Sequence, residues 1–188
     1  TDAYEGARVR IGQWFGVEDT GEVILLRGAT EALNLVANAL STRLESGDVV
    51  LVGETEHHAN IVPWQQLESR IGIQVIPIPV DATGTLCLES AKKLCKEHEV
   101  AVIAIGHVSN AVGAINDVSG FIQLAKDNNA FSVIDGAQAA PHMRVNVQDL
   151  HADFYAVSAH KCCGPTGIGV LIGQRELLES LPPWQGGG

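Results

Sequence analysis

The sequence predicts an α/β fold in which one mainly parallel sheet of seven strands lies between two layers of helices. Three observations lead to this prediction. Runs rich in Val, Ile and Leu alternate with segments of helical periodicity along the 188 residues. Four of these runs are nearly continuous in apolar residues, as expected of strands buried on both faces. The third observation is the segment between the last two runs, residues 159–167, because nine residues are too few for a parallel crossover.

The expected elements follow one another in a regular order. Strands are expected at residues 22–27, 48–52, 74–78, 100–105, 131–135, 154–158 and 168–172. Helices are expected at residues 4–16, 30–40, 59–71, 89–98 and 118–128. The seventh strand is expected to run antiparallel to the sixth, because their connection is short.

The composition is that of a single globular domain over residues 1–188, with 46% hydrophobic and 18% charged residues. A net charge of −10 argues against a surface for nucleic acid or anionic membrane, which would need basic patches. No signal peptide is recognised, and the four cysteines lack the spacing of a secreted scaffold, so a cytoplasmic location is expected. Because the sequence starts inside a helical pattern and stops in the loop sequence PPWQGGG, we expect a fragment of a longer protein.

Polar residues follow five of the predicted strands, at the point where each strand ends. In order along the chain, these motifs are RGATE, ETEHHAN, GHVSN, DGAQ and SAHK. In an open α/β sheet, ligands bind beyond the carboxyl ends of the parallel strands. The five motifs therefore predict one ligand-binding site at that edge of the sheet.

The first motif places Gly28, Ala29 and Thr30 at the start of a helix. The free N–H groups and the positive dipole end of a helix suit an anion, most often a phosphate. The structural alternative is that Thr30 is only the N-cap of this helix, with Gly28 making the turn.

Asp135 ends an apolar run, where a carboxylate is costly unless a partner pairs with it. One hypothesis is a buried anion held for a cationic partner such as a protonated ring nitrogen. The alternative is an aspartate that only caps a turn. Gln138 lies three residues further on and could reach the same ligand.

The histidines permit two hypotheses. His57 could stack as a neutral imidazole on a flat aromatic ligand, although a buried histidine with satisfied hydrogen bonds is the ordinary alternative. A zinc site is the second hypothesis, with ligands from His57, His58, His160, Cys162 and Cys163. Adjacent ligand pairs are not the usual spacing of a zinc site, so no metal is expected.

Lys161 follows a nearly continuous apolar strand and lies among these motifs. A lysine is usually a solvated surface charge. A desolvated lysine beside other cationic groups is instead a usable amine, which can form a Schiff base with an aldehyde. A phosphate site, an aspartate for a ring nitrogen, a stacking histidine and such a lysine together predict pyridoxal 5′-phosphate as the cofactor.

The glycine run at residues 164–169 precedes a strand and not a helix, so it does not indicate a nucleotide loop.

Six stretches closely resemble the class V aminotransferase family of fold-type-I pyridoxal-phosphate enzymes. They are RGATEALNLVA, EHHANIVPWQ, HVSNAVG, VIDGAQAA, DFYAVSAHKCCGPTGIGVL and PPWQGGG. The most similar branch is that of the cysteine desulfurases and selenocysteine lyases. The resemblance covers nearly the whole chain and implies the large, cofactor-binding domain of that fold type.

The resemblance implies a role for each matching residue. Lys161 matches the lysine that holds the cofactor, and Asp135 matches the carboxylate that pairs with its ring nitrogen. His57 matches the residue stacked on the ring, and Lys161, Asp135 and His57 would be the catalytic residues. Gln138 matches the partner of the phenolic oxygen, and Asn110 matches the asparagine at the edge shared by cofactor and substrate. The phosphate would be bound by four further residues: Ala29 through its backbone, Thr30, Ser158 and His160.

The chain departs from the family pattern at two places. Ala159 stands where the family usually has glycine, and Cys162-Cys163 stands where a bulkier pair is usual. Neither cysteine matches the catalytic cysteine of the family, which belongs to a mobile loop of a later domain. The chain alone is therefore expected to be inactive.

The resemblance implies a cysteine desulfurase that converts L-cysteine into alanine and an enzyme-bound persulfide. It further implies a cytoplasmic homodimer that passes sulfur to an acceptor protein, as in iron–sulfur cluster assembly. Selenocysteine lyase, transamination and a kynureninase-like cleavage use the same core and stay open as alternatives. A non-catalytic folded fragment without cofactor, or a zinc protein, would be the alternatives of another class.

Overall fold

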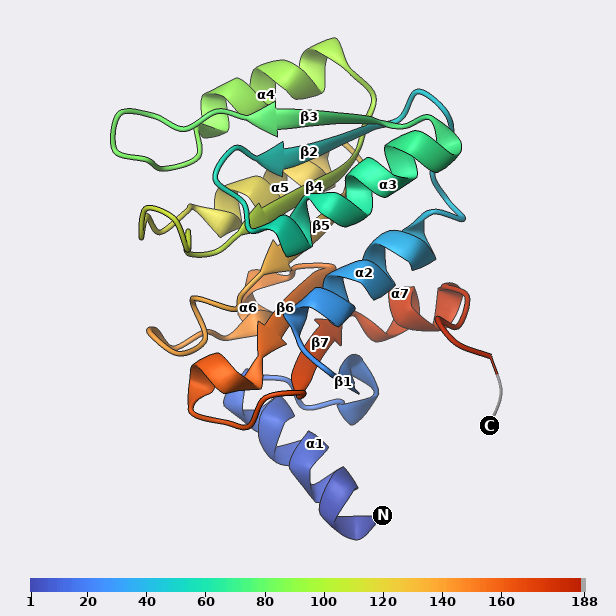
Figure 1. The fold of residues 1–188 in the computed structure, drawn as a ribbon, viewed down its shortest axis with the longest axis vertical. Coiled ribbons are helices and arrows are strands. Elements are labelled where there is room, and N and C mark those ends of the chain that lie inside the picture. Colours follow the sequence, from blue (N-terminus) through green and yellow to red (C-terminus); the bar gives the residue numbers. More distant parts are fainter. Residues whose placement is uncertain (187–188) are drawn as a thin grey trace.

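The computed structural model describes residues 1–186 and contains one seven-stranded sheet, in the order β1-β7-β6-β5-β4-β2-β3 (Figure 1). The predicted fold class is confirmed. The strands are β1 Val23–Leu26, β2 Val49–Gly53, β3 Gln74–Ile78, β4 Val100–Gly106, β5 Phe131–Asp135, β6 Phe154–Ser158 and β7 Gly169–Gly173. The α-helices are α1 Asp2–Trp14, α2 Ala29–Leu40, α3 Val62–Ile71, α4 Leu88–Glu97, α5 Val118–Asp127, α6 Val147–Leu150 and α7 Arg175–Ser180, and the 3-10 helices are η1 Thr20–Glu22, η2 His58–Asn60 and η3 Ala159–Cys162.

Strand β7 alone runs against the rest of the sheet. It pairs antiparallel with β6 on one side and with β1 on the other, while β3, β2, β4, β5 and β6 pair in parallel. The antiparallel direction expected for the seventh strand is therefore confirmed. Its register sets Ser158, the last residue of β6, opposite Gly169, the first residue of β7.

Helices cover both faces of the sheet (Figure 1). On one face, α2 and α3 bury Leu33, Val36 and Trp64 in one hydrophobic cluster. On the other face, α4 and α5 pack in a second cluster, in which Phe121 is 1% exposed. The sheet lies between these clusters, which explains why its central strands are apolar on both faces.

The helix expected at residues 59–71 is two elements in the structure, η2 and α3, separated by Ile61. Pro63 lies in the first turn of α3, and proline fits there because its missing N–H would have no helical partner. The proline therefore marks the start of the helix, and the preceding residues form a separate turn. Helices α6 and α7 were not predicted, because four and six residues are too few to show a helical period.

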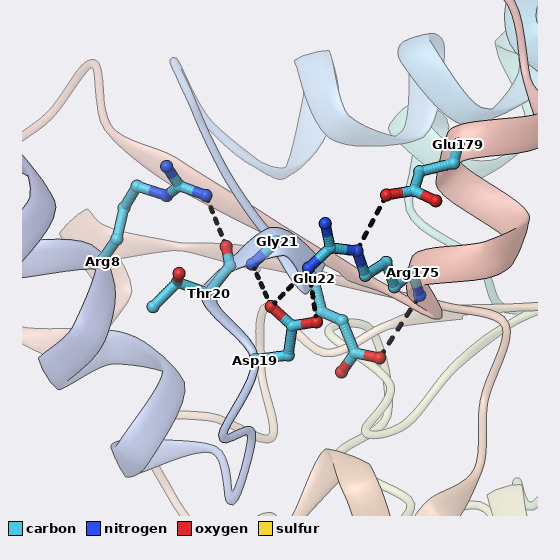
Figure 2. Close-up of polar contacts among 7 residues, drawn as sticks. All are labelled: Arg8, Asp19, Thr20, Gly21, Glu22, Arg175 and Glu179. Atoms are coloured by element: carbon cyan, nitrogen blue, oxygen red, sulfur yellow. Dashed lines mark hydrogen bonds and ion pairs between the residues drawn. The ribbon is translucent and has the colours of Figure 1, made fainter.

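An exposed cluster of ion pairs joins the two ends of the chain at the edge of the sheet where β7 ends (Figure 2). The guanidinium of Arg175, on α7, pairs with Asp19 at 2.9 Å and with Glu179 at 2.8 Å. The backbone N–H of Arg175 donates to Glu22 at 3.3 Å, and the guanidinium of Arg8 donates to the carbonyl of Thr20.

Among residues 1–186, no helix is both long and apolar enough to span a membrane.

Candidate active site

The polar motifs predicted to converge do so beyond the carboxyl ends of β2, β4, β5 and β6. Register places Gly106 at the end of β4 opposite Asp135 at the end of β5, and Asp135 opposite Ala156 of β6. A small pocket opens above these strand ends. Five of the predicted residues line it: His57, Asn110, Asp135, Gln138 and Lys161.

Asp135 is buried, with 8% of its surface exposed. Its Oδ1 accepts a hydrogen bond from the N–H of Ala137 at 2.9 Å, and within residues 1–186 this is the one hydrogen bond to the carboxylate. Burial raises the pKa of Asp135, while the Ala137 N–H and the positive charges of Lys161 and His57 oppose that rise. One oxygen of Asp135 thus caps a turn, as in the structural alternative, and the other has no hydrogen-bond partner within residues 1–186. A cationic ring nitrogen as its partner stays a prediction.

Lys161 lies on η3, the turn that directly follows β6. All five residues of β6 are buried, so the strand carries the chain out of the core at this point. The turn closes with a hydrogen bond from the N–H of Gly164 to the carbonyl of Ala159 at 2.9 Å, and Cys163 adopts a left-handed conformation with φ of 61°. Lys161 is half-buried and lines the same pocket as Asp135, which makes it the one amine beside the buried carboxylate in residues 1–186.

His57 is exposed and lines the pocket, so the alternative of a fully buried histidine is wrong. Its Nδ1 accepts a hydrogen bond from the N–H of Ala59 at 3.1 Å. A neutral ring with an accepting Nδ1 carries its proton on Nε2. Stacking of this ring on a cofactor stays a prediction.

The predicted phosphate site is built around the start of α2. The helix begins at Ala29 with Gly28 as its N-cap, so the alternative in which Thr30 is the N-cap is wrong. The Ala29 N–H donates to Oγ of Ser158 at 2.8 Å, which fastens the helix end to the end of β6. Gly169 lies directly beneath, since a Cβ at that position would be 2.3 Å from Cα of Gly28. Thr30 and His160, the remaining two residues of the set, are exposed near this end, and no hydrogen bond joins them.

The two departures from the family pattern lie away from this pocket. Ala159, Cys162 and Cys163 line a separate apolar groove together with Trp14 and Ile168. The methyl group of Ala159 therefore does not narrow the pocket that holds Asp135. In the described part of the chain, no three His, Cys, Asp or Glu side chains are placed to hold a metal ion, so the zinc alternative has no geometric support.

Sequence reasoning missed six of the residues that line the pocket, and Glu56 is the charged one among them. Burial raises its pKa to about 7, and the charge of Asp135 adds to the rise, although hydrogen bonds from Asn60 and Gly106 oppose it. A glutamate directly before the predicted stacking histidine was visible in ETEHHAN. The enclosure of its carboxyl group was not visible, because it depends on the glycines that end β2 and β4.

These residues fit pyridoxal phosphate. The unpartnered oxygen of Asp135 suits a protonated ring nitrogen, because a buried carboxylate is stabilised by a cation that donates a hydrogen bond to it. Lys161 is an amine within the same pocket, and the start of α2 suits an anion. The donor set thus matches the three parts of the cofactor: ring nitrogen, aldehyde and phosphate.

Comparisons with known proteins point in one direction. A family model described as aminotransferase class-V matches residues 1–188. A protein of Vibrio cholerae named probable cysteine desulfurase is 44% identical over 189 residues, which cover all of this chain and 46% of the relative. A cysteine desulfurase of Synechococcus elongatus is also 44% identical, over all of this chain and 30% of the relative.

Solved structures agree with these relatives. The cysteine desulfurase CsdA of Escherichia coli superposes with a TM-score of 0.94 at 39% identity, over 98% of this chain and 46% of that protein. The apo cysteine desulfurase of Thermococcus onnurineus gives a TM-score of 0.90 at 40% identity, over 96% of this chain and 44% of that protein. The chain therefore spans less than half the length of these proteins.

Proposed function

The chain belongs to the class V aminotransferase family, and on that premise we propose that it is the pyridoxal-phosphate-binding core of a cysteine desulfurase. Cysteine desulfurases depend on this cofactor, and they are the relatives that match the chain over its whole length. In this proposal residues 1–188 form the large domain of a longer protein, which supplies the remaining parts of the catalytic machinery.

The pocket residues would hold the cofactor. Lys161 would hold it covalently through Nζ, Asp135 would pair with the ring nitrogen, and His57 would lie against the ring. Asn110 and Gln138 line the same pocket and would contact the polar edge of the ring. The phosphate would be held at the start of α2 by the Ala29 backbone, Thr30, Ser158 and His160.

Pyridoxal phosphate, when bound, supplies an aldehyde for amines and a ring that accepts electrons from the substrate. The chain supplies the acid–base and electrostatic chemistry around it. Lys161, as a free amine, takes and returns a proton at Nζ beside the substrate. Asp135 would stabilise a proton on the ring nitrogen through its negative charge, and its burial would make that interaction stronger than in water.

The observation that carries the proposal is the position of Asp135. A buried carboxylate with one unpartnered oxygen is costly to the free protein, and Lys161 is the cationic side chain that lines the same pocket. Such an arrangement is typical of a site prepared for a cationic ligand.

We propose L-cysteine as the substrate, with alanine as product and the sulfur retained as a persulfide on a cysteine outside residues 1–188. We further propose a cytoplasmic homodimer that delivers sulfur to an acceptor protein, in keeping with iron–sulfur cluster assembly. The relatives' names support the substrate, because they are cysteine desulfurases.

The proposal is tested by supplying the complete protein with pyridoxal phosphate and measuring alanine formed from L-cysteine and from L-selenocysteine. Turnover of L-cysteine that is lost in Lys161→Ala is the expected result. Turnover of selenocysteine alone would assign a selenocysteine lyase. Failure to form alanine from either substrate, while the cofactor is bound, would contradict a desulfurase and favour another reaction of the family.

A further inference from the structure

The carboxyl group of Glu56 occupies a notch between the ends of β2 and β4. Each strand ends in a glycine, Gly53 and Gly106. A Cβ added to Gly53 would lie 2.4 Å from Oε1 of Glu56, and a Cβ added to Gly106 would lie 3.3 Å from Oε2. The absence of a side chain at both strand ends thus makes room for this carboxyl group.

Two hydrogen bonds fix Glu56 in the notch. Its Oε1 accepts from the backbone N–H of Gly106 at 2.7 Å, and its Oε2 accepts from Nδ2 of Asn60 at 2.8 Å. Glu56 and Asn60 flank His57, and the N–H of Asn60 also donates to the carbonyl of His57 at 2.8 Å. The Glu56–Asn60 hydrogen bond therefore closes the turn that carries His57, and Glu56 fastens this turn to the end of β4, whose neighbour β5 ends at Asp135.

Two further observations concern the proton on Glu56. The other titratable groups that line its pocket are His57, Asp135 and Lys161, and the negative charge of Asp135 adds to the rise in the pKa of Glu56. Asn60 is fully buried, and its Oδ1 has no hydrogen-bond partner within residues 1–186. The orientation of an amide is assigned from its hydrogen bonds, so a rotated Asn60 would turn Oδ1 toward Glu56. Oδ1 would then accept a hydrogen bond from the O–H of a neutral Glu56.

We propose that Glu56 is a positioning residue that holds the His57 turn on the sheet and that, when protonated, leaves Asp135 as the only negative charge facing the cofactor ring. The proposal rests on the proposed function, because both residues that Glu56 serves belong to the cofactor pocket. A second ionised carboxylate in this pocket would compete with Asp135 for the ring nitrogen's charge. A neutral carboxyl beside a rotated Asn60 has a hydrogen bond at each oxygen and avoids that competition.

The first test is cofactor affinity, measured by titrating pyridoxal phosphate into the complete apoprotein and following absorbance. The variants are Glu56→Gln, which resembles a neutral acid, and Glu56→Ala, which leaves Gly106 and Asn60 without a partner. Glu18→Gln, an exposed glutamate, is the matched control. We expect Kd within about threefold of the wild type for Glu56→Gln, and a loss of roughly tenfold or more for Glu56→Ala.

A Glu56→Gln affinity as poor as that of Glu56→Ala would overturn the neutral acid, and an unchanged affinity in Glu56→Ala would overturn the positioning role. If the wild type itself binds no cofactor, the proposed function fails, and the second test then decides on Glu56 alone.

The second test compares the thermal stability of the apoprotein with that of Glu56→Gln between pH 5 and pH 8. The pKa of Glu56 is raised on folding from 4.5 to about 7, so the folded state binds a proton that the unfolded state has lost in this window. Stability contributed by that proton is present at the acidic end and is lost as the pH rises through about 7. Glutamine has no proton to lose.

We therefore expect Glu56→Gln to melt near the wild-type temperature at pH 5 and above it at pH 8, while Glu18→Gln follows the wild type throughout. A Glu56→Gln variant that melts below the wild type at pH 8 would show that the ionised carboxylate is the stabilising form, and would overturn the proposal. This comparison does not require Glu56→Ala to fold.

Discussion

The molecule contains two groups of carboxylates whose environments are opposite. The exposed group, Asp19 and Glu179 around Arg175, joins α7 to η1 (Figure 2). The enclosed group, half-buried Glu56 and buried Asp135, lies beyond the carboxyl ends of β2 and β5. A hydrogen bond from Arg175 lowers the pKa of Asp19, whereas burial raises the pKa of both Glu56 and Asp135.

This difference separates structural charges from functional ones. An exposed ion pair gains little, because water and salt screen it and its side chains lose freedom. A buried carboxylate with an incomplete set of partners destabilises the free protein, and such groups cluster at binding and catalytic sites. The folded chain thus tolerates an unfavourable pair of acids at the same edge where Lys161 and the start of α2 lie.

The largest expected effect is that of Asp135→Asn on turnover by the complete protein. Asparagine keeps the size of the side chain but cannot hold a proton on a ring nitrogen by charge. We expect kcat to fall by roughly 10²–10³, as for the loss of one electrostatic group in a preorganised site. Steady-state kinetics measure this, and absorbance of the bound cofactor should show that the variant still retains it. Near-normal turnover would show that the charge of Asp135 is not needed for catalysis.

The next effect concerns packing beneath the phosphate site. In Gly169→Ala, the new Cβ would lie 2.3–2.6 Å from the backbone of Gly28, so the start of α2 must move. We expect a loss of about 3 kcal/mol in the free energy of unfolding, at the upper end for overpacking, measured by denaturant titration.

Gly6→Ala is the matched control, because Gly6 lies inside α1 with no atom within 4 Å of its added Cβ. It should gain up to about 1 kcal/mol from helix propensity. If Gly169→Ala and Gly6→Ala change the free energy of unfolding equally, the close approach of Gly169 to Gly28 does not limit stability.

The smallest effect is expected in the exposed group. Arg175→Ala removes the ion pairs with Asp19 and Glu179, and we expect a slight decrease in melting temperature at low salt. High salt should abolish the difference from the wild type, because screening weakens the pairs that are lost. A large decrease that persists in high salt would contradict the division between the two groups.

Most of the fold could be predicted, because alternation of apolar runs with helical periods is a local property of the sequence. The antiparallel direction of β7 also followed locally, from the short connection at residues 159–167. The break between η2 and α3 was missed although Pro63 marks it, since the apolar period continues across it.

The site could be predicted only in part. Asp135 and Lys161 follow apolar strands, so their burial could be inferred from neighbouring residues. Glu56 also follows an apolar strand, β2, but its place depends on a hydrogen bond to Gly106, which lies 50 positions away. A contact at that separation is set by the pairing of β2 with β4, which no local pattern encodes.

The central claim is that Lys161 holds pyridoxal phosphate beside Asp135. The most direct measurement is borohydride reduction of the cofactor-loaded protein, followed by mass-spectrometric mapping of the modified peptide. The chain has four other lysines, Lys92, Lys93, Lys96 and Lys126, which serve as internal controls. The account predicts the pyridoxyl group on Lys161 alone, and no reducible visible absorbance in Lys161→Ala. A pyridoxyl group on any of the four other lysines, with Lys161 unmodified, would contradict it.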